Sequence, residues 1–273
     1  MGHQHKLRLV LRQYQAVLPT LSQRLQDWAD KYSRLLDVAC LRSALRGKLS
    51  RRQYRDGEHE RVRTGYLLVK YLLAQLSRLK TFGTVLEFPS GPGHYTAYPG
   101  DLAVHSVATG FDYVAADGVQ DAVDLTERRT RRSFKKAGQP FSSVRFITAT
   151  HEDIADHFRD GELVLTFIFE LTLHLELFEI YHLLTKLKRK TRKGGIILIS
   201  LTSKENNFMV EFDEQRTYLH PRQAIIKMMR PWRPVFIPSY LANALFFARQ
   251  ISQLRLPIHP EHVEYVAFMK PEK

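Results

Sequence analysis

The chain changes its hydrophobic pattern near Phe82-Gly83. Before this point, apolar residues recur every three or four positions, which is the spacing of amphipathic helices. The highly charged segment 50–57 lacks this spacing, so we expect no regular element there. The pattern predicts three helices, at residues 7–18, 21–40 and 58–80.

After Gly83, short apolar runs alternate with stretches of helical spacing. The runs predict strands at 84–88, 113–116, 144–148, 163–169 and 196–201, and the stretches predict helices at 121–136, 175–190 and 241–254. Strands that alternate with helices indicate crossover units and a parallel sheet. Two late runs, 235–237 and 263–269, favour an antiparallel C-terminal edge. The expected class is therefore α/β, a doubly wound and mostly parallel sheet at 81–273 behind a helical N-terminal extension at 1–80.

Charge is unevenly distributed along the chain. The formal net charge is +13, and residues 1–80 hold 17 Lys and Arg against 6 Asp and Glu, whereas residues 81–273 hold 24 against 22. These basic N-terminal helices favour an anionic partner, such as RNA, a membrane surface or a phosphorylated substrate. Ordinary solvated helix faces are the alternative interpretation.

The cysteine content and the length of the apolar runs limit the cellular locations that we expect. The one cysteine, Cys40, allows no internal disulfide, so we expect a reducing, cytoplasmic location. No apolar run approaches the roughly 18 residues of a membrane span. The sequence leaves the oligomeric state open, with a homodimer as one option.

The segment Val85-Leu-Glu-Phe-Pro-Ser-Gly-Pro-Gly93 combines a strand that ends in an acid with a glycine loop. Glycine lets a backbone turn tightly and approach a ligand closely. Ligands of open α/β sheets bind at the carboxyl ends of strands, where this loop lies. The following helix is broken by Tyr98-Pro-Gly100, and we expect it to restart with Asp101 as its cap.

These residues resemble the first motif of the class I S-adenosylmethionine (SAM)-dependent methyltransferases, which have a Rossmann-like fold. Later segments agree with that family in their order, namely 114–117, 144–154, 162–175 and 193–200. The resemblance implies that SAM is the cofactor. The residues that it assigns to SAM binding are Glu87, Pro89, Ser90, Gly91, Gly93, Asp117, Gly118, Thr150, His151, Thr166 and Phe167.

Each acid has an expected role in this interpretation. Asp117 ends the second strand, where a carboxylate accepts hydrogen bonds from both ribose hydroxyls. Glu87 either takes a hydrogen bond through the loop or reaches the amino group of the methionine part. Thr150 stands where the family often has an acid that contacts adenine.

The resemblance also implies methyl transfer to an oxygen or nitrogen of a small-molecule acceptor, without a metal. His174 and Glu170 follow the fourth strand and are candidate general bases, although His174 could equally orient a helix end. We expect the N-terminal helices to form a lid with Arg61, Arg63 and Tyr66 at the acceptor surface. An RNA methyltransferase, or a non-catalytic module that binds RNA or protein, remains the alternative.

Overall fold

The computed structural model describes residues 51–91, 93, 95–97, 101–202, 208–212, 215–220, 222–235 and 263–272. All of them belong to one compact unit, Leu49–Lys273. The predicted helices at 7–18, 21–40 and 241–254 lie outside the described residues.

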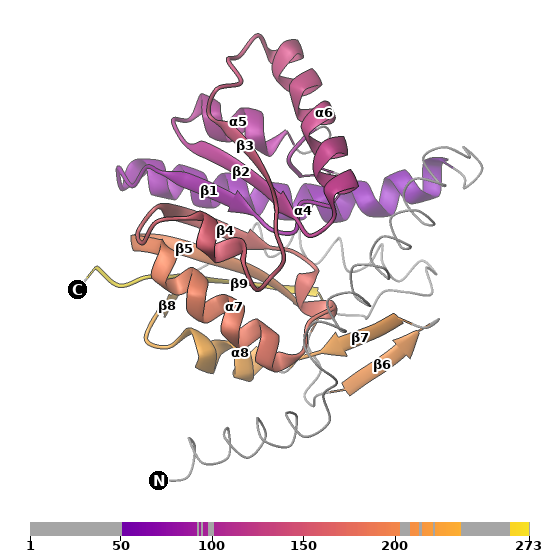
Figure 1. Ribbon diagram of the computed structural model, residues 1–273, viewed down its shortest axis with the longest axis vertical. Helices are drawn as coiled ribbons and strands as arrows, with labels where there is room; N and C mark the ends of the chain where they lie inside the picture. The colour runs from indigo at the N-terminus through magenta and orange to yellow at the C-terminus, as the bar shows by residue number, and fades with distance from the viewer. Residues whose placement is uncertain are drawn as a thin grey trace. The chain divides into compact units, whose positions relative to one another are not determined.

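A seven-stranded sheet forms the centre of this unit (Figure 1). Its strand order is β3-β2-β1-β4-β5-β9-β8. β1 to β5 run parallel, while β9 pairs antiparallel with β5 and β8 pairs antiparallel with β9. The strands are β1 (Thr84–Glu87), β2 (Asp112–Asp117), β3 (Val144–Thr148), β4 (Leu163–Ile168), β5 (Thr191–Thr202), β8 (Arg233–Pro234) and β9 (Val263–Met269). The predicted doubly wound sheet with an antiparallel C-terminal edge is confirmed.

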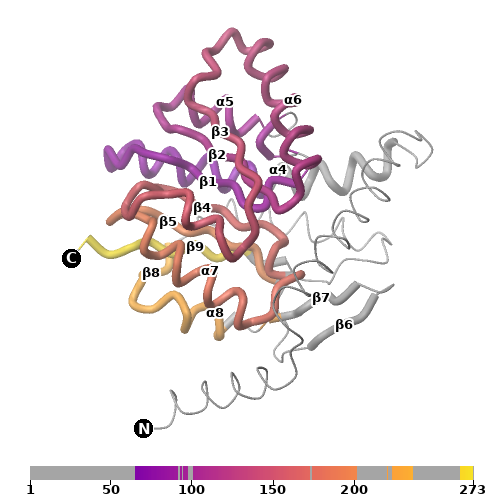
Figure 2. The backbone as a smooth tube through the Cα atoms, in the orientation of Figure 1, coloured from indigo at the N-terminus to yellow at the C-terminus, as the bar shows by residue number. Residues whose placement is uncertain are grey.

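Helices cover both faces of the sheet, and the backbone trace follows the same path in Figure 2. Helices α4, α5 and α6 pack on one face, whereas α7, α8 and the 3-10 turn η2 pack on the other. Their bounds are α4 (Arg51–Arg78), α5 (Leu102–Ala108), α6 (Gln120–Ala137), α7 (Leu177–Lys190), α8 (Arg222–Met229), η2 (Ile154–His157) and η3 (Leu171–Leu173).

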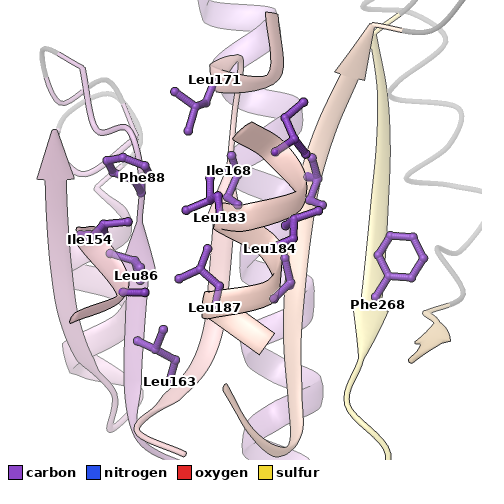
Figure 3. Packing of buried hydrophobic residues seen from close by; sticks show 14 of the residues in the cluster. Leu86, Phe88, Ile154, Leu163, Ile168, Leu171, Leu183, Leu184, Leu187 and Phe268 are labelled. Carbon is purple, nitrogen blue, oxygen red and sulfur yellow. The ribbon is translucent and has the colours of Figure 1, made fainter. Parts of the chain in front are cut away.

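The core on the α7 face is built from apolar side chains of adjacent strands (Figure 3). Leu86 and Ile168 of the sheet pack with Leu183 and Leu187 of α7, and all four are at most 1% exposed. Strands that are buried on both faces cannot alternate apolar and polar residues, which explains the continuous apolar runs in the sequence.

The second half of α4 belongs to the core on the other face. Leu68, Leu72 and Leu76 are buried with Val85 and Val164 of the sheet. The last helix of the N-terminal segment therefore shares its core with the sheet.

Several elements differ from the prediction at their ends. The 50–57 segment was expected to be irregular, but α4 starts at Arg51 and continues through it. Arginine and glutamine are good helix formers, and one glycine costs a helix only about 1 kcal/mol. Asp101 does precede α5, but its φ is 49° and its side chain does not cap the helix.

The start of β5 and the position of the edge strand β8 also depart from the expected bounds. β5 starts at Thr191 rather than residue 196, because a bulge lets Leu163 pair with Thr191 and Leu165 pair with Ile196. The edge strand expected at 235–237 is found at Arg233–Pro234, and the Val235 N–H still donates to the Ala267 carbonyl at 2.8 Å.

The hairpin of β6 (Phe208–Phe212) and β7 (Gln215–Leu219), and helix α8, have no counterpart in the sequence-based prediction. Among the described residues, no helix is long and apolar enough to cross a membrane.

We expect Leu187→Ala to lower the free energy of unfolding by about 3 kcal/mol, because it leaves a cavity in the α7 core. The matched control is Leu79→Ala, since Leu79 is 57% exposed and should cost less than about 0.5 kcal/mol. Urea denaturation of both variants measures the difference, and equal losses would contradict the described core.

Candidate functional site

The glycine loop follows β1 and is attached to both neighbouring strands. The Phe88 N–H donates to the Phe167 carbonyl of β4 at 3.1 Å. The Ser90 N–H donates to the Ala116 carbonyl of β2 at 2.7 Å. The loop therefore lies at the carboxyl edge of the sheet, across the point where β1 meets β2 and β4.

Helix α6 fixes the loop from the other side. The Thr126 hydroxyl donates to the Gly91 carbonyl at 2.9 Å. A Cβ on Gly93 would lie 2.9 Å from Thr126 Oγ1 and 3.2 Å from its Cα, whereas a Cβ on Gly91 would meet nothing within 4 Å. Gly93 is thus needed for contact with α6, and Gly91 faces open space.

Asp117 connects the end of β2 to this loop. Its Oδ2 accepts the Gly91 N–H at 2.8 Å, and its Oδ1 accepts the Val119 N–H at 3.0 Å. Burial raises the pKa of Asp117 to about 6, while the N–H donors of Gly91, Val119 and Gly118 act in the opposite direction. The carboxylate therefore holds the loop in place and is ionised at pH 7.

Glu87 is the second buried acid of the site. It is 1% exposed, and its Oε2 accepts a hydrogen bond from the Tyr113 hydroxyl at 2.5 Å and another from the Thr96 hydroxyl. Burial raises the pKa of Glu87 to about 8, and the hydrogen bonds from Thr96 and Tyr113 only partly offset this effect. Glu87 is thus a neutral acid at pH 7, and the hydrogen bonds that its Oε2 accepts come from Thr96, which follows the loop, and from Tyr113 of β2.

The loop after β3 carries the residues expected near adenine. The backbone N–H and the hydroxyl of Thr150 both bond to Asp153 Oδ1, at 2.6 and 2.8 Å. His151 is buried beside Glu179, with 3.6 Å between Nε2 and Oε1. Burial lowers the pKa of His151 to about 4, so the imidazole is neutral at pH 7. In this structure the Thr150 hydroxyl thus donates its hydrogen bond to Asp153.

The end of β4 holds the other predicted residues. Thr166 and Phe167 are buried within the strand. Glu170 follows with φ of 65°, and its N–H donates to the Ser200 hydroxyl at 2.7 Å. His174 ends the η3 turn. Both candidate bases therefore lie beyond the carboxyl end of β4, on the same edge as the glycine loop.

The predicted acceptor residues lie on α4. The side chains of Arg61 and Arg63 are outside the described residues, whereas Tyr66 is half-buried with the Lys70 ammonium 4.4 Å from its ring centre. One position before Tyr66, a Cβ on Gly65 would lie 2.8 Å from the Tyr95 ring and 2.9 Å from the Phe169 ring. The helix thus passes directly over an aromatic pair.

Some residues of the site were not predicted. Thr96, Tyr113 and Thr126 each hold a part of the glycine loop, and only Tyr113 carried a signal, as a hydroxyl within an apolar strand. His220 is buried, and its Nε2 lies 2.8 Å from the Leu175 carbonyl behind η3. Nothing in the sequence pattern placed residue 220 beside the segment after η3.

Two buried oxygens at the loop have no hydrogen-bond partner among the described residues, namely Ser90 Oγ and Glu87 Oε1. With the open space at Gly91, they leave polar groups for a ligand to satisfy. No group of three or more His, Cys, Asp or Glu side chains in the described part of the chain is arranged to hold a metal ion.

Many solved structures share this architecture, and two of them illustrate it. One is a 1,6-didemethyltoxoflavin N1-methyltransferase of Burkholderia thailandensis with bound S-adenosylhomocysteine, at 15% identity and a TM-score of 0.51 over 89% of this chain and 90% of that one. The other is a magnesium protoporphyrin IX methyltransferase of Synechocystis PCC 6803 with bound SAM, at 11% identity and a TM-score of 0.56 over 90% and 96%. The chain has the class I methyltransferase fold. The predicted resemblance is confirmed at the level of this fold.

No family model and no curated protein sequence matches the chain. The methyltransferase fold is thus established by structural similarity, and the roles of individual residues come from the geometry described above.

We expect Gly93→Ala to lower the free energy of unfolding by about 2–3 kcal/mol, because it adds a clash with Thr126 to the cost of a positive φ. Gly138→Ala is the matched control, since Gly138 also has a positive φ but open space at its Cβ, and it should cost only about 1 kcal/mol. Thermal or urea denaturation compares them, and equal losses would contradict the contact with α6.

The raised pKa of Glu87 predicts a pH-dependent stability. Between its ordinary pKa of 4.5 and its folded pKa of about 8, the unfolded chain releases a proton that the folded protein keeps. Stability therefore falls as pH rises through this window, by at most about 1.4 kcal/mol per pH unit.

Glu87→Gln should remove this dependence above about pH 7, where Asp117 is ionised and His151 is neutral in the folded and the unfolded chain alike. Urea denaturation at several pH values measures the slope, with Glu152→Gln as the control because Glu152 is less deeply buried. A Glu87→Gln variant that keeps the wild-type slope would show that Glu87 is ionised in the folded protein.

Proposed function

We propose that the protein is a SAM-dependent methyltransferase that acts on an oxygen or nitrogen of a small molecule. The observation that carries the proposal is the meeting of the glycine loop and the Asp117 carboxylate at the carboxyl edge of the sheet. This is the place at which open α/β sheets bind ligands. The two similar structures contain SAM or S-adenosylhomocysteine, which supports the choice of cofactor.

The residues present fit such a cofactor. Asp117 has lone pairs beyond those used by Gly91 and Val119, and it is the acceptor for the ribose hydroxyls. Gly91 leaves room for the ligand beside the loop, and Ser90 Oγ supplies a buried polar group. Pro89, Gly93 and Gly118 set the shape of the loop and of the turn after β2. Thr150, His151, Thr166 and Phe167 line the neighbouring strand ends.

The chemistry requires alignment more than it requires catalytic groups. SAM supplies an activated methyl group on a sulfonium sulfur, and the acceptor must lie in line with it in a site that excludes water. His174 and Glu170 lie at the correct edge to take a proton from an acceptor hydroxyl or amine. We assign acceptor binding to Arg61, Arg63 and Tyr66, which lie within the bounds of α4. We also propose a cytoplasmic location, because the single cysteine allows no internal disulfide.

The alternative function is RNA binding, either by an RNA methyltransferase or by a non-catalytic module on the same fold. The +11 charge of residues 1–80, which is 17 basic minus 6 acidic residues, supports it. Failure to bind SAM by the folded protein would favour the non-catalytic module.

The direct test is calorimetric titration with SAM and S-adenosylhomocysteine. Asp117→Ala should weaken binding at least tenfold, or about 1.4 kcal/mol, because it removes the acceptor for the ribose. Asp112→Ala is the matched control, since Asp112 is an exposed acid at the other end of the same strand, and it should change the affinity less than about twofold. Absence of binding by the folded wild-type protein would contradict the proposal.

The pKa of Asp117 adds a pH test. Because the ionised carboxylate accepts the ribose hydroxyls, affinity should fall as pH decreases through about 6, by up to tenfold per unit. Titrations across pH 5 to 8 measure this trend. The Asp117→Asn variant should bind weakly at every pH in this range, with no such trend. A wild-type affinity that is constant across this range would show that Asp117 does not contact the ligand through its charge.

A further inference from the structure

The outward face of α6 is acidic in its first turns, at Asp121 and Asp124, and its charged residues beyond Glu127 are all cations. Of the residues of α6, which the structure describes throughout, five basic ones are exposed between residues 128 and 136, where they form a stripe. They recur at helical spacing on the side opposite the buried Thr126, Thr130 and Phe134. They are Arg128, Arg131, Arg132, Lys135 and Lys136.

The helix dipole explains only part of this stripe. Cations are favoured in the last turn of a helix, where Lys135 and Lys136 lie, but the effect fades within that turn. Arg128, Arg131 and Arg132 lie further from the C-terminus. Solvated helix faces usually mix charges of both signs. The acid nearest to these five residues along α6 is Glu127, and it is paired with Arg131 at 2.6 Å.

A cavity of about 650 Å³ lies at the amino ends of β1 to β4, the opposite edge from the glycine loop. Arg145, Arg159 and Arg192 line it, together with Ser142 and Ser143. Its location on strands and loops means that helix dipoles do not account for these arginines.

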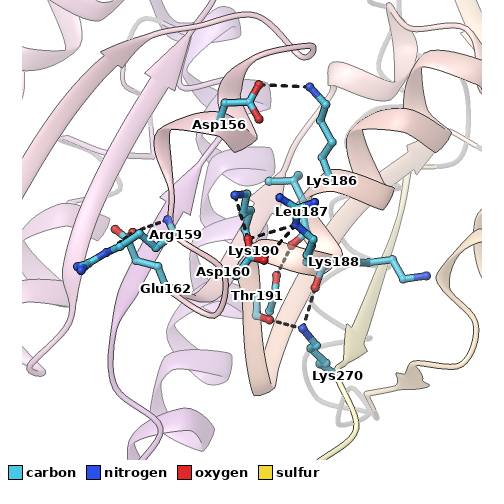
Figure 4. A network of polar contacts seen from close by, with 11 residues as sticks. Asp156, Arg159, Asp160, Glu162, Lys186, Leu187, Lys188, Lys190, Thr191 and Lys270 are labelled. Carbon is cyan, nitrogen blue, oxygen red and sulfur yellow. Dashed lines mark hydrogen bonds and ion pairs between the residues drawn. The ribbon is translucent and has the colours of Figure 1, made fainter.

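Two of the three acids that line this cavity are paired with cations, and the third, Asp112, is exposed. Glu162 Oε1 accepts a hydrogen bond from Arg145 at 2.8 Å, and Asp160 is paired with Arg189 at 3.1 Å and with Lys190 at 3.0 Å (Figure 4 shows the groups around Asp160 and Glu162). The Arg159 side chain is 94% exposed. An anion that binds beside Arg159 therefore meets an exposed guanidinium and two acids that carry counter-charges.

An aromatic side chain connects the stripe with the cavity. Phe141 precedes Ser142, stacks on Phe146 with 5.9 Å between ring centres, and lies 4.3 Å beneath the Arg131 guanidinium. Basic grooves with aromatic platforms are typical of proteins that bind single-stranded nucleic acids. β3, which carries Arg145, is the outer strand of the sheet at this side.

We propose that the exposed face of α6 and the cavity beside it bind the phosphodiester backbone of a single-stranded nucleic acid. A membrane surface fits less well, because interfacial helices interleave cations with large apolar side chains. Among the described residues the exposed large apolar side chains are Leu79, Phe82 and Tyr181, and none lies on α6 or β3. The surface excludes the glycine loop, so the inference does not depend on methyl transfer.

The test measures binding of the full-length protein to fluorescein-labelled oligouridine RNA and oligothymidine DNA, each about 20 nucleotides long. The triple variant Arg132→Gln, Lys135→Gln and Arg159→Gln should weaken binding about tenfold or more. Its plot of log affinity against log salt concentration should flatten by about 2, since each lost phosphate contact contributes about 0.7. Comparison of the two probes distinguishes an RNA ligand from a DNA ligand.

The control is the triple variant Lys227→Gln, Arg230→Gln and Arg233→Gln, whose residues are also exposed but belong to α8, the turn after it and β8, at the other side of the sheet. Both variants keep residues 1–80 and lose the same charge. The control should change affinity less than about twofold, and both should melt like the wild type and bind SAM equally. Equal losses of nucleic acid affinity in the two variants would overturn the proposal.

A local measurement completes the test. Acetylation of lysines by a succinimidyl ester, read by mass spectrometry, should be slowed at Lys135 and Lys136 when RNA or DNA is bound, but not at Lys227. Unchanged acetylation at all three sites would overturn the proposal. So would binding to phosphatidylserine vesicles that depends on Arg132, Lys135 and Arg159 when neither oligonucleotide binds, because the partner would then be a membrane.

Discussion

The site depends on the hydrogen bonds from the Gly91 and Val119 N–H groups to the Asp117 carboxylate. They join the glycine loop after β1 to the turn after β2, so that the ends of these two strands form one surface. The bonds require a charge at a fully buried position, and burial makes that charge costly enough to move the pKa to about 6. The loop thus has its shape because an acid at this point stays ionised near neutral pH.

Glu87, at the end of the neighbouring strand β1, is a buried acid in the opposite protonation state. It lies on the face covered by α4 and α5, among Tyr113, Phe167 and other core side chains, where no cation of the described residues acts on its charge. The carboxyl group instead stays protonated at neutral pH and bonds to two hydroxyls. Two neighbouring acids of similar appearance in the sequence therefore have different charges and different functions, one as an anchor for the loop and one as a core hydrogen-bonding group.

The strands and the glycine loop were predictable because parallel strands that are buried on both faces leave continuous apolar runs, and because glycines mark the turn at the end of β1. The contacts of Glu87 were not predictable. They depend on the register that pairs Val85 with Tyr113, and neither residue carries that information locally. The bulge that pairs Leu163 with Thr191 was missed for the same reason, because it depends on pairing between distant segments. The helix that runs through Gly57 was missed because the propensity of arginine and glutamine for helix outweighs the cost of one glycine.

The most direct measurement is hydrogen–deuterium exchange of the full-length protein with and without S-adenosylhomocysteine, read by mass spectrometry. If the ligand lies between the glycine loop and Asp117, exchange should slow in peptides that cover 88–97 and 117–120. Peptides that cover 138–145, at the opposite edge of the sheet, should not change. Protection confined to any other part of the chain, or no protection at a saturating ligand concentration, would contradict the assignment of the cofactor site.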